Sequence, residues 1–254
     1  ALRLQKVNSQ VELQTAVVDL TGANAESLLS NVDLIIDGTD NFHARYLLND
    51  VSVKKKIPWI YAGIVAGHGM TMTFLPESGP CFRCVFPEAP SAGLNPTCDT
   101  AGILESTVAV LSGFQCTEAL KILCGNHQAL KPGLLHVDIW ERRFLDIDSG
   151  AKLSDCPCCA KRNFEYLKQE NDILTTQLCG RDAVQVSLST PMQLDLAALA
   201  ARLEPLGEVR LNRFMLRAFV ESYELSVFPD GRCIVKGTTD EVVAKSVHAR
   251  FIGD

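Results

Sequence analysis

The sequence has 254 residues, a hydrophobic fraction of 47%, a charged fraction of 21% and a formal net charge of -6. This length allows one large domain or a medium domain with a small one, and the composition is that of a globular protein. The acidic balance argues against nucleic acid as the main partner, and no apolar run is long enough to span a membrane.

The first half of the chain predicts strands at 11–18, 32–36, 58–62, 69–75 and 134–138, and helices at 25–29, 42–56 and 103–124. The order strand, helix, strand over 32–62 is typical of an α/β sheet. The mostly apolar helix 103–124 predicts deep burial or a subunit interface. Residues 76–101 are rich in Pro, Gly and Cys, and we expect a functional loop there.

The composition changes near residue 160, which predicts a second, smaller domain. We expect residues 1–160 to form the first domain, 161–180 a linker and 181–254 a small α+β domain of the split-βαβ type. Its strands are expected at 184–188, 208–211, 216–220, 224–228 and 232–236, and its helices at 195–203 and 239–251. The turn Pro229-Asp230-Gly231 should join the last two strands in a hairpin.

Ten cysteines are present, and five of them lie in two tight clusters. The first residues lack the apolar core of a signal peptide and include no initiator methionine. We therefore expect a cytoplasmic protein whose clustered cysteines are metal ligands or reactive thiols rather than disulfides. The missing methionine suggests a chain that begins partway through a longer protein.

The two clusters are C-x2-C turns, Cys81-Phe82-Arg83-Cys84 and Cys156-Pro157-Cys158-Cys159. Each turn directs two thiolates at one tetrahedral ion, so two turns predict a closed, structural zinc (Zn2+) site with four cysteine ligands. The spacing favours Cys156 with Cys159, although Cys158 could replace Cys159. The alternatives are buried free thiols or a redox pair.

Two further segments carry candidate functional residues. Asp37-Gly38-Thr39-Asp40-Asn41 follows a buried strand, where ligands of α/β sheets bind, so Asp40 could hold Mg2+ near a phosphate chain. The alternative is an N-cap of the following helix by Asp or Asn, and both can hold together. Cys98 lies in a loop before a helix, a position that can make a thiol reactive; it could instead be inert or a fifth candidate zinc ligand.

Five segments together resemble the ThiF and MoeB adenylyltransferases, which activate ubiquitin-like sulfur carrier proteins in thiamine and molybdopterin synthesis. They are Asp33 to Phe42, Cys81 to Pro87, Asn95 to Leu104, Gln115 to Lys121 and Asp155 to Cys159. Their order and spacing agree along residues 1 to about 160. The resemblance implies a Rossmann-like, mostly parallel sheet and a homodimer formed with the help of the long apolar helix.

The family uses MgATP to adenylylate the C-terminal glycine of the carrier and releases pyrophosphate. By this resemblance Asp40 would bind Mg2+ and the ATP phosphates, and Asn41 would flank the nucleotide. Cys98 resembles the cysteine that forms a thioester or acyl-disulfide with the carrier in some members. The implied zinc ligands are Cys81, Cys84, Cys156 and Cys159.

One departure from the family concerns the nucleotide cradle. Members open with a glycine-rich turn, followed by an acidic residue and basic residues that reach the phosphates, and residues 1–32 supply none of these. We therefore expect an absent N-terminal segment and impaired activity of this chain alone. The alternative function is a non-catalytic, zinc-containing module that binds a ubiquitin-like carrier. The C-terminal extension has no role that the sequence assigns.

Overall fold

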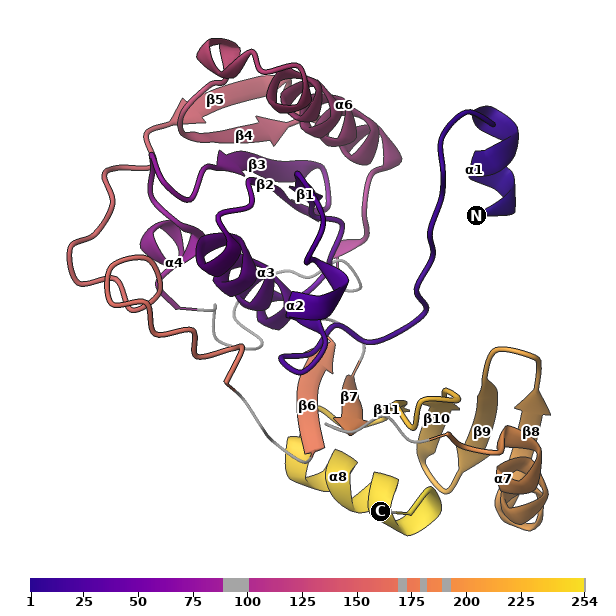
Figure 1. Ribbon diagram of the computed structural model, residues 1–254. Coiled ribbons are helices and arrows are strands. Elements are labelled where there is room, and N and C mark those ends of the chain that lie inside the picture. Colours follow the sequence, from indigo (N-terminus) through magenta and orange to yellow (C-terminus); the bar gives the residue numbers. More distant parts are fainter. Residues whose placement is uncertain (89–100, 169–172, 179–181, 189–192, 254) are drawn as a thin grey trace.

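The computed structural model describes residues 1–88, 101–168, 173–178, 182–188 and 193–253. Two β-sheets organise these residues (Figure 1): a five-stranded sheet in the order β1-β2-β3-β4-β5 and a six-stranded sheet in the order β6-β7-β11-β10-β9-β8. Among the helices of this described part, none has the length and apolar character needed to cross a membrane.

The first sheet and its helices come from the N-terminal part of the chain. Their bounds are α1 Leu2–Val7, α2 Ala25–Leu28, β1 Ile35–Ile36, α3 Phe42–Lys55, β2 Trp59–Val65, β3 His68–Phe74, α4 Phe82–Val85, α6 Glu105–Leu123, η1 His127–Ala129, β4 Leu134–Asp138 and β5 Arg143–Ile147. Most expected elements between 25 and 138 are present. The strand expected at 11–18 is wrong: this segment is irregular and largely exposed, and no described strand pairs with it.

The first sheet is mixed rather than mostly parallel. Strand β1 pairs with β2 in parallel, whereas the ladders β2–β3, β3–β4 and β4–β5 are antiparallel. The reason is connectivity, because parallel neighbours need a crossover and the described residues of this sheet contain one, β1-α3-β2. The expected Rossmann-like, mostly parallel sheet is therefore confirmed only as an α/β fold whose sheet contains a parallel pair.

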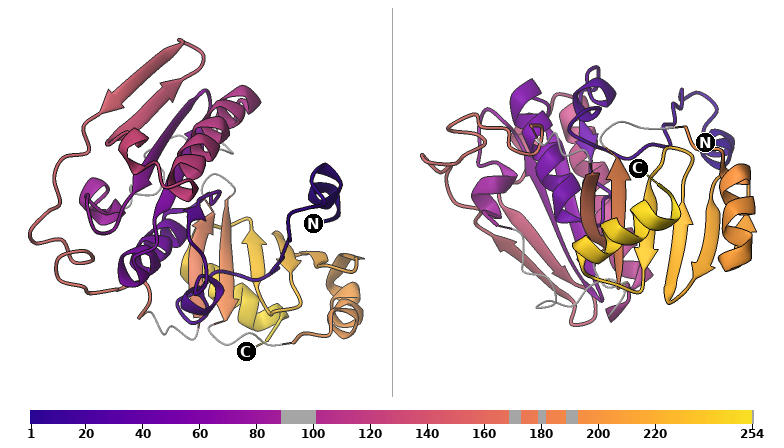
Figure 2. Two further views of the ribbon diagram at one scale, coloured as in Figure 1. Left: turned by 45° about the horizontal axis from the view of Figure 1, so that its top comes forward. Right: turned by 90° about the horizontal axis from the view of Figure 1, so that it is seen from below.

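Helices cover both faces of this sheet (Figure 2). Side chains alternate along a strand, so Trp59 and Tyr61 of β2 point to one face and Ile60 points to the other. Trp59 and Tyr61 pack in an aromatic core with Tyr46 of α3 and Phe82 of α4. Ile60 packs against α6 through Ala119 and Ile122. The carboxyl ends of β1 and β2 are therefore held between α3 and α6.

The second sheet is entirely antiparallel in its described ladders. Its elements are β6 Ile173–Leu178, β7 Ala183–Leu188, α7 Leu196–Leu203, η2 Glu204–Leu206, β8 Gly207–Leu211, β9 Leu216–Val220, β10 Tyr223–Val227, β11 Cys233–Lys236 and α8 Glu241–Phe251. The predicted β10–β11 hairpin is confirmed. Strands β8 to β11 form a meander rather than a split-βαβ arrangement, and β6 lies inside 161–180, where a linker was expected.

Side-chain hydrogen bonds connect the N-terminal segment to the second sheet. The Asp19 carboxylate accepts from the Ser187 hydroxyl at 2.7 Å and from the Gln185 amide at 3.0 Å. Both donors belong to β7, so residues far apart in sequence lie side by side here.

Candidate functional site

The turn after β1 is built around a buried carboxylate, Asp37. The backbone N–H and the hydroxyl of Thr39 both donate to Asp37 Oδ1, each at 2.7 Å. Arg45 Nε of α3 forms an ion pair with Asp37 Oδ2 at 3.4 Å. Burial raises the pKa of Asp37, and the Arg45 guanidinium partly offsets this rise. The carboxylate therefore organises the turn and is not available to a ligand.

Arg45 also joins the turn to the neighbouring strand. Its Nη2 donates to the carbonyl oxygens of Thr39 at 2.6 Å and Ala62 at 3.2 Å. The guanidinium lies over the rings of Phe42 and Tyr61, with centroid distances of 5.6 and 5.3 Å. Each contact fixes the first turn of α3 against the ends of β1 and β2.

Gln115 of α6 secures the same strand ends from the opposite face of the sheet. Its Nε2 donates to the carbonyl oxygens of Asp37 at 2.9 Å and Ile60 at 3.1 Å. Sequence reasoning missed the positioning roles of Asp37, Arg45 and Gln115. The signal available was a polar residue in an otherwise apolar helix, as at Gln115.

Asp40 and Asn41 are placed side by side by this turn. The Asn41 side chain caps α3 by accepting from the Ala44 N–H at 2.8 Å, and its amide donates to Asp40 Oδ1 at 3.2 Å. Asp40 itself is exposed. The capping alternative thus holds for Asn41, while the Asp40 carboxylate faces solvent at the carboxyl end of β1.

The four predicted zinc ligands converge. The Sγ atoms of Cys81 and Cys84 are 3.8 Å apart, those of Cys81 and Cys156 3.6 Å, and those of Cys84 and Cys159 3.5 Å. All four sulfurs lie within 4.8 Å of one another. A tetrahedral zinc with Zn–S bonds of about 2.3 Å requires sulfurs about 3.8 Å apart. The donor set and its spacing therefore fit zinc.

Cys158 lies beside this group but outside it. Its sulfur accepts from Asn49 Nδ2 of α3 at 3.2 Å. A hydrogen bond with the Cys158 thiol lowers the pKa of Cys81 to about 4, whereas the same contact and burial raise the pKa of Cys158. Cys159, rather than Cys158, completes the group of four converging sulfurs, which agrees with the spacing argument for Cys159.

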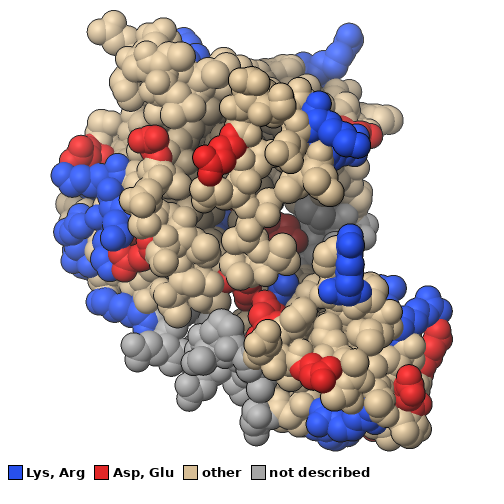
Figure 3. Space-filling view, turned by 45° about the vertical axis from the view of Figure 1, so that its right-hand side comes forward, with Lys and Arg blue, Asp and Glu red and all other residues tan. Residues whose placement is uncertain are grey.

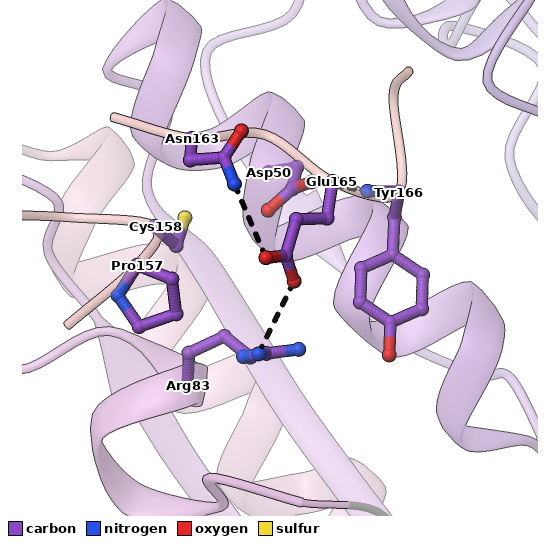
Figure 4. A pocket seen from close by; sticks show the side chains of 7 residues that line it. All are labelled: Asp50, Arg83, Pro157, Cys158, Asn163, Glu165 and Tyr166. Atoms are coloured by element: carbon purple, nitrogen blue, oxygen red, sulfur yellow. Dashed lines mark hydrogen bonds and ion pairs between the residues drawn. The ribbon is translucent and has the colours of Figure 1, made fainter. Parts of the chain in front are cut away.

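The chain beyond the second cysteine turn folds back against α3 (Figure 4). Arg83 forms an ion pair with Glu165 at 3.3 Å and lies over the rings of Tyr46 and Tyr166. The Tyr166 N–H donates to Asp50 Oδ2 at 2.9 Å, and burial raises the pKa of Asp50 to about 6. These contacts pack the residues around the cysteine cluster into one unit with α3.

Cys98, the third candidate functional residue, lies outside the described residues. Of the predicted site residues, the structure therefore places Asp40 and Asn41 at one location and the four cysteines at another.

Comparisons with known proteins show which sequences and structures the chain resembles. The sequence profile of the ThiF family matches residues 1–158. The chain is 36% identical over 253 residues to the sulfur carrier protein ThiS adenylyltransferase of Bacillus subtilis, covering 99% of this chain and 74% of that protein. It is 36% identical over 162 residues to a sulfur carrier protein adenylyltransferase of Thermus thermophilus, covering 62% of this chain and 59% of the relative.

A further relative is the adenylyltransferase and sulfurtransferase MOCS3 of Culex quinquefasciatus, 35% identical over 157 residues. The match covers 62% of this chain and 36% of that protein. Among solved structures, E. coli MccB with MccA-N7isoASN aligns with a TM-score of 0.52 at 13% identity, covering 63% of this chain and 49% of MccB. This likeness concerns the fold alone.

Proposed function

Because the chain belongs to the ThiF family, we propose that it uses MgATP to adenylylate the C-terminal glycine of a ubiquitin-like sulfur carrier protein. The observation that carries this proposal is the exposed Asp40 carboxylate at the carboxyl end of a parallel strand. Ligands of α/β sheets bind at this edge, and Mg2+ there takes one or two carboxylates together with phosphate oxygens. The names of the relatives support the same reaction.

In this reaction a carboxylate oxygen of the carrier attacks the α-phosphorus of ATP. The bond from that phosphorus to the bridging oxygen breaks, pyrophosphate leaves, and an acyl adenylate forms. Asp40 would hold Mg2+, which neutralises phosphate charge, and Asn41 would flank the nucleotide. The buried contacts of Asp37, Arg45 and Gln115 keep the turn in place, so that little reorganisation is needed when charge develops.

We assign the four cysteines to a structural zinc. A shell of four thiolates leaves no coordination position for water, so this centre would take no part in the transfer. It would join the turn at 81–84 to the turn at 156–159. Cys81 and Cys156 are 75 residues apart in the sequence, and so are Cys84 and Cys159. A metal clip that closes so long a segment restricts the unfolded chain. Cysteines bind zinc only when they are reduced, and the cytoplasm keeps thiols reduced, so we propose a cytoplasmic location.

The carrier that we favour is of the ThiS type. The supporting observation is the extent of the matches, since the ThiS adenylyltransferase aligns along 253 residues, including the second sheet, while the MOCS3 relative aligns along 157. For Cys98 we propose a covalent link with the activated carrier, on the strength of the sequence resemblance.

We also propose a homodimer through α6. Four exposed side chains line one side of this helix, because they recur at spacings of eight, four and three residues. They are Val108, Cys116, Leu120 and Leu123. We call this set the α6 surface. On the face of the molecule drawn in Figure 3, residues other than Lys, Arg, Asp and Glu make up most of the surface. An apolar helix side of this kind suits a second copy of the chain.

Carrier-dependent exchange of labelled pyrophosphate into ATP tests the proposed reaction. The full chain of the protein should be used, including any residues that precede Ala1. Exchange should require Mg2+ and a carrier with its C-terminal glycine, and a carrier shortened by that glycine is the matched control. Carrier binding by calorimetry without exchange would instead favour the non-catalytic module.

A further inference from the structure

Asn49 lies in the middle of α3 and is fully buried, with an exposed fraction of 0%. Its Oδ1 accepts from the backbone N–H of Phe82 at 2.8 Å. Its Nδ2 donates to Cys158 Sγ at 3.2 Å. One amide therefore makes two hydrogen bonds in a region that excludes water.

The two partners of Asn49 belong to different cysteine turns. Phe82 stands between Cys81 and Cys84, and Cys158 stands between Cys156 and Cys159. Neither partner belongs to the four-sulfur group. A single side chain on a rigid helix thus contacts both halves of the proposed metal centre without being a ligand.

From this geometry we infer that Asn49 is a positioning residue, which fixes the two cysteine turns at the separation that zinc requires. The inference rests on the proposed zinc centre. The two turns come from distant parts of the chain, and their alignment before metal binding needs a common support. Asn49 supplies that support because a neutral amide offers both the acceptor for Phe82 and the donor for Cys158.

The same contact also holds the sulfur of Cys158, which lies outside the four-sulfur group. The Cys158 sulfur accepts from Asn49 Nδ2 at 3.2 Å. A sulfur held by a buried amide is less free to move into the zinc shell. Asn49 therefore also favours Cys159 over its neighbour as the fourth ligand.

The test is the rate at which a chromogenic chelator removes zinc from the folded protein. Asn49→Leu removes both hydrogen bonds at similar volume, and we expect zinc loss to be about 10-fold faster, the lower end of the effect on metal affinity of removing a ligand's own hydrogen-bond partner. Asn49→Asp keeps the acceptor for Phe82 and places a carboxylate oxygen against Cys158, so it should also release zinc faster. The release rate of Asn49→Asp provides the test if Asn49→Leu does not fold.

Ser52→Ala is the matched control. Ser52 is buried on the same helix, and its hydroxyl donates to the Ile57 carbonyl at 2.6 Å, away from both cysteine turns. This variant should lose stability but keep the wild-type release rate. Release from both Asn49 variants within twofold of wild type would overturn the inference alone. A wild-type protein that binds no zinc would overturn the metal centre, and the inference with it.

Discussion

Two carboxylates at the end of β1 lie three residues apart in different surroundings. Asp37 is buried against Arg45, whereas Asp40 is exposed beside the cap of α3. The sequence identifies this acidic turn and favours Asp40 as the ligand, but it does not show that Asp37 is a buried structural carboxylate. That division depends on Arg45 and Gln115, which reach the turn from different helices.

Asp40→Asn tests the proposed catalytic role at this position. The substitution removes the charge that would hold Mg2+ while leaving the helix cap intact. We expect carrier-dependent pyrophosphate exchange to fall by about 100-fold or more, with little change in the free energy of unfolding. Asn41→Ala is the comparison, since loss of its cap should cost about 1 kcal/mol of stability. Full exchange activity in the Asp40 variant would refute the assignment.

The choice between Cys158 and Cys159 is tested by single alanine substitutions. Cys159→Ala should lower bound zinc well below one per chain, because it removes one of four converging sulfurs. Cys158→Ala should retain one zinc per chain, although it loses the hydrogen bond from Asn49. Metal analysis after dialysis gives both numbers. Zinc loss in the Cys158 variant with retention in the Cys159 variant would reverse the assignment.

Among the elements, α3 does most to connect the two candidate sites. Its first turn contacts the acidic turn through Arg45, and its middle contacts the cysteine turns through Asn49. The local sequence, with lysines in the last turn, predicts this helix. It gives no account of which buried polar residues bond to which segments, because those partners are up to 109 residues away.

Arg45→Met tests the buried pair that anchors α3 to β1. Removing the guanidinium leaves the Asp37 carboxylate buried without its cation, which should cost about 3–5 kcal/mol of unfolding free energy. The double variant with Asp37→Asn should recover part of this loss. Denaturant unfolding of the four proteins measures the coupling. Additive losses would show that the pair is not coupled.

The same pair predicts a pH dependence. Burial raises the pKa of Asp37 in the folded state above its ordinary value of 3.8, so the folded protein holds this proton more tightly than the unfolded chain. This group therefore lowers stability as pH rises from about 3.8 through its folded pKa. In Arg45→Met the folded pKa should rise further and extend that window upward. The free energy of unfolding, measured as a function of pH, should show the wider pH window in Arg45→Met. The substitution Asp37→Asn should abolish this pH dependence.

Several elements were predictable because their patterns are local. The apolar run of β1, the alternation of β3 and the Pro-Asp-Gly turn before β11 each identify a structure from neighbouring residues. Edge strand β5 was missed because all of its residues are exposed and it has no buried face. The segment 11–18 alternates like a strand but has no described partner. Mixed pairing in the first sheet depends on connectivity, which periodicity does not encode.

At the scale of the whole molecule, the α6 surface predicts self-association. Leu120 is 62% exposed on this surface, and Leu120→Glu places a charge where the second copy would pack. We expect the wild type to sediment as a dimer and this variant as a monomer. Val242→Glu is the control, since Val242 is 76% exposed on α8, away from α6. A monomeric wild type would contradict the proposed dimer.

The two candidate sites differ in how far the sequence predicts them. The cysteine centre follows from spacing alone, because each C-x2-C turn already pairs two ligands. The Asp40 site follows from its place after a buried strand together with the family resemblance, whereas its supporting residues could be identified only from the tertiary structure. Cys98 lies outside the described residues, so its role rests on the sequence.

The mass of the carrier protein tests the proposed reaction most directly. A ThiS-type carrier is incubated with the full chain and MgATP under mildly acidic quench, and its intact mass is measured. The account predicts a carrier heavier by one adenylate, absent when Mg2+ is removed or Asp40 is changed to Asn. A carrier that binds the protein but keeps its original mass would contradict the account.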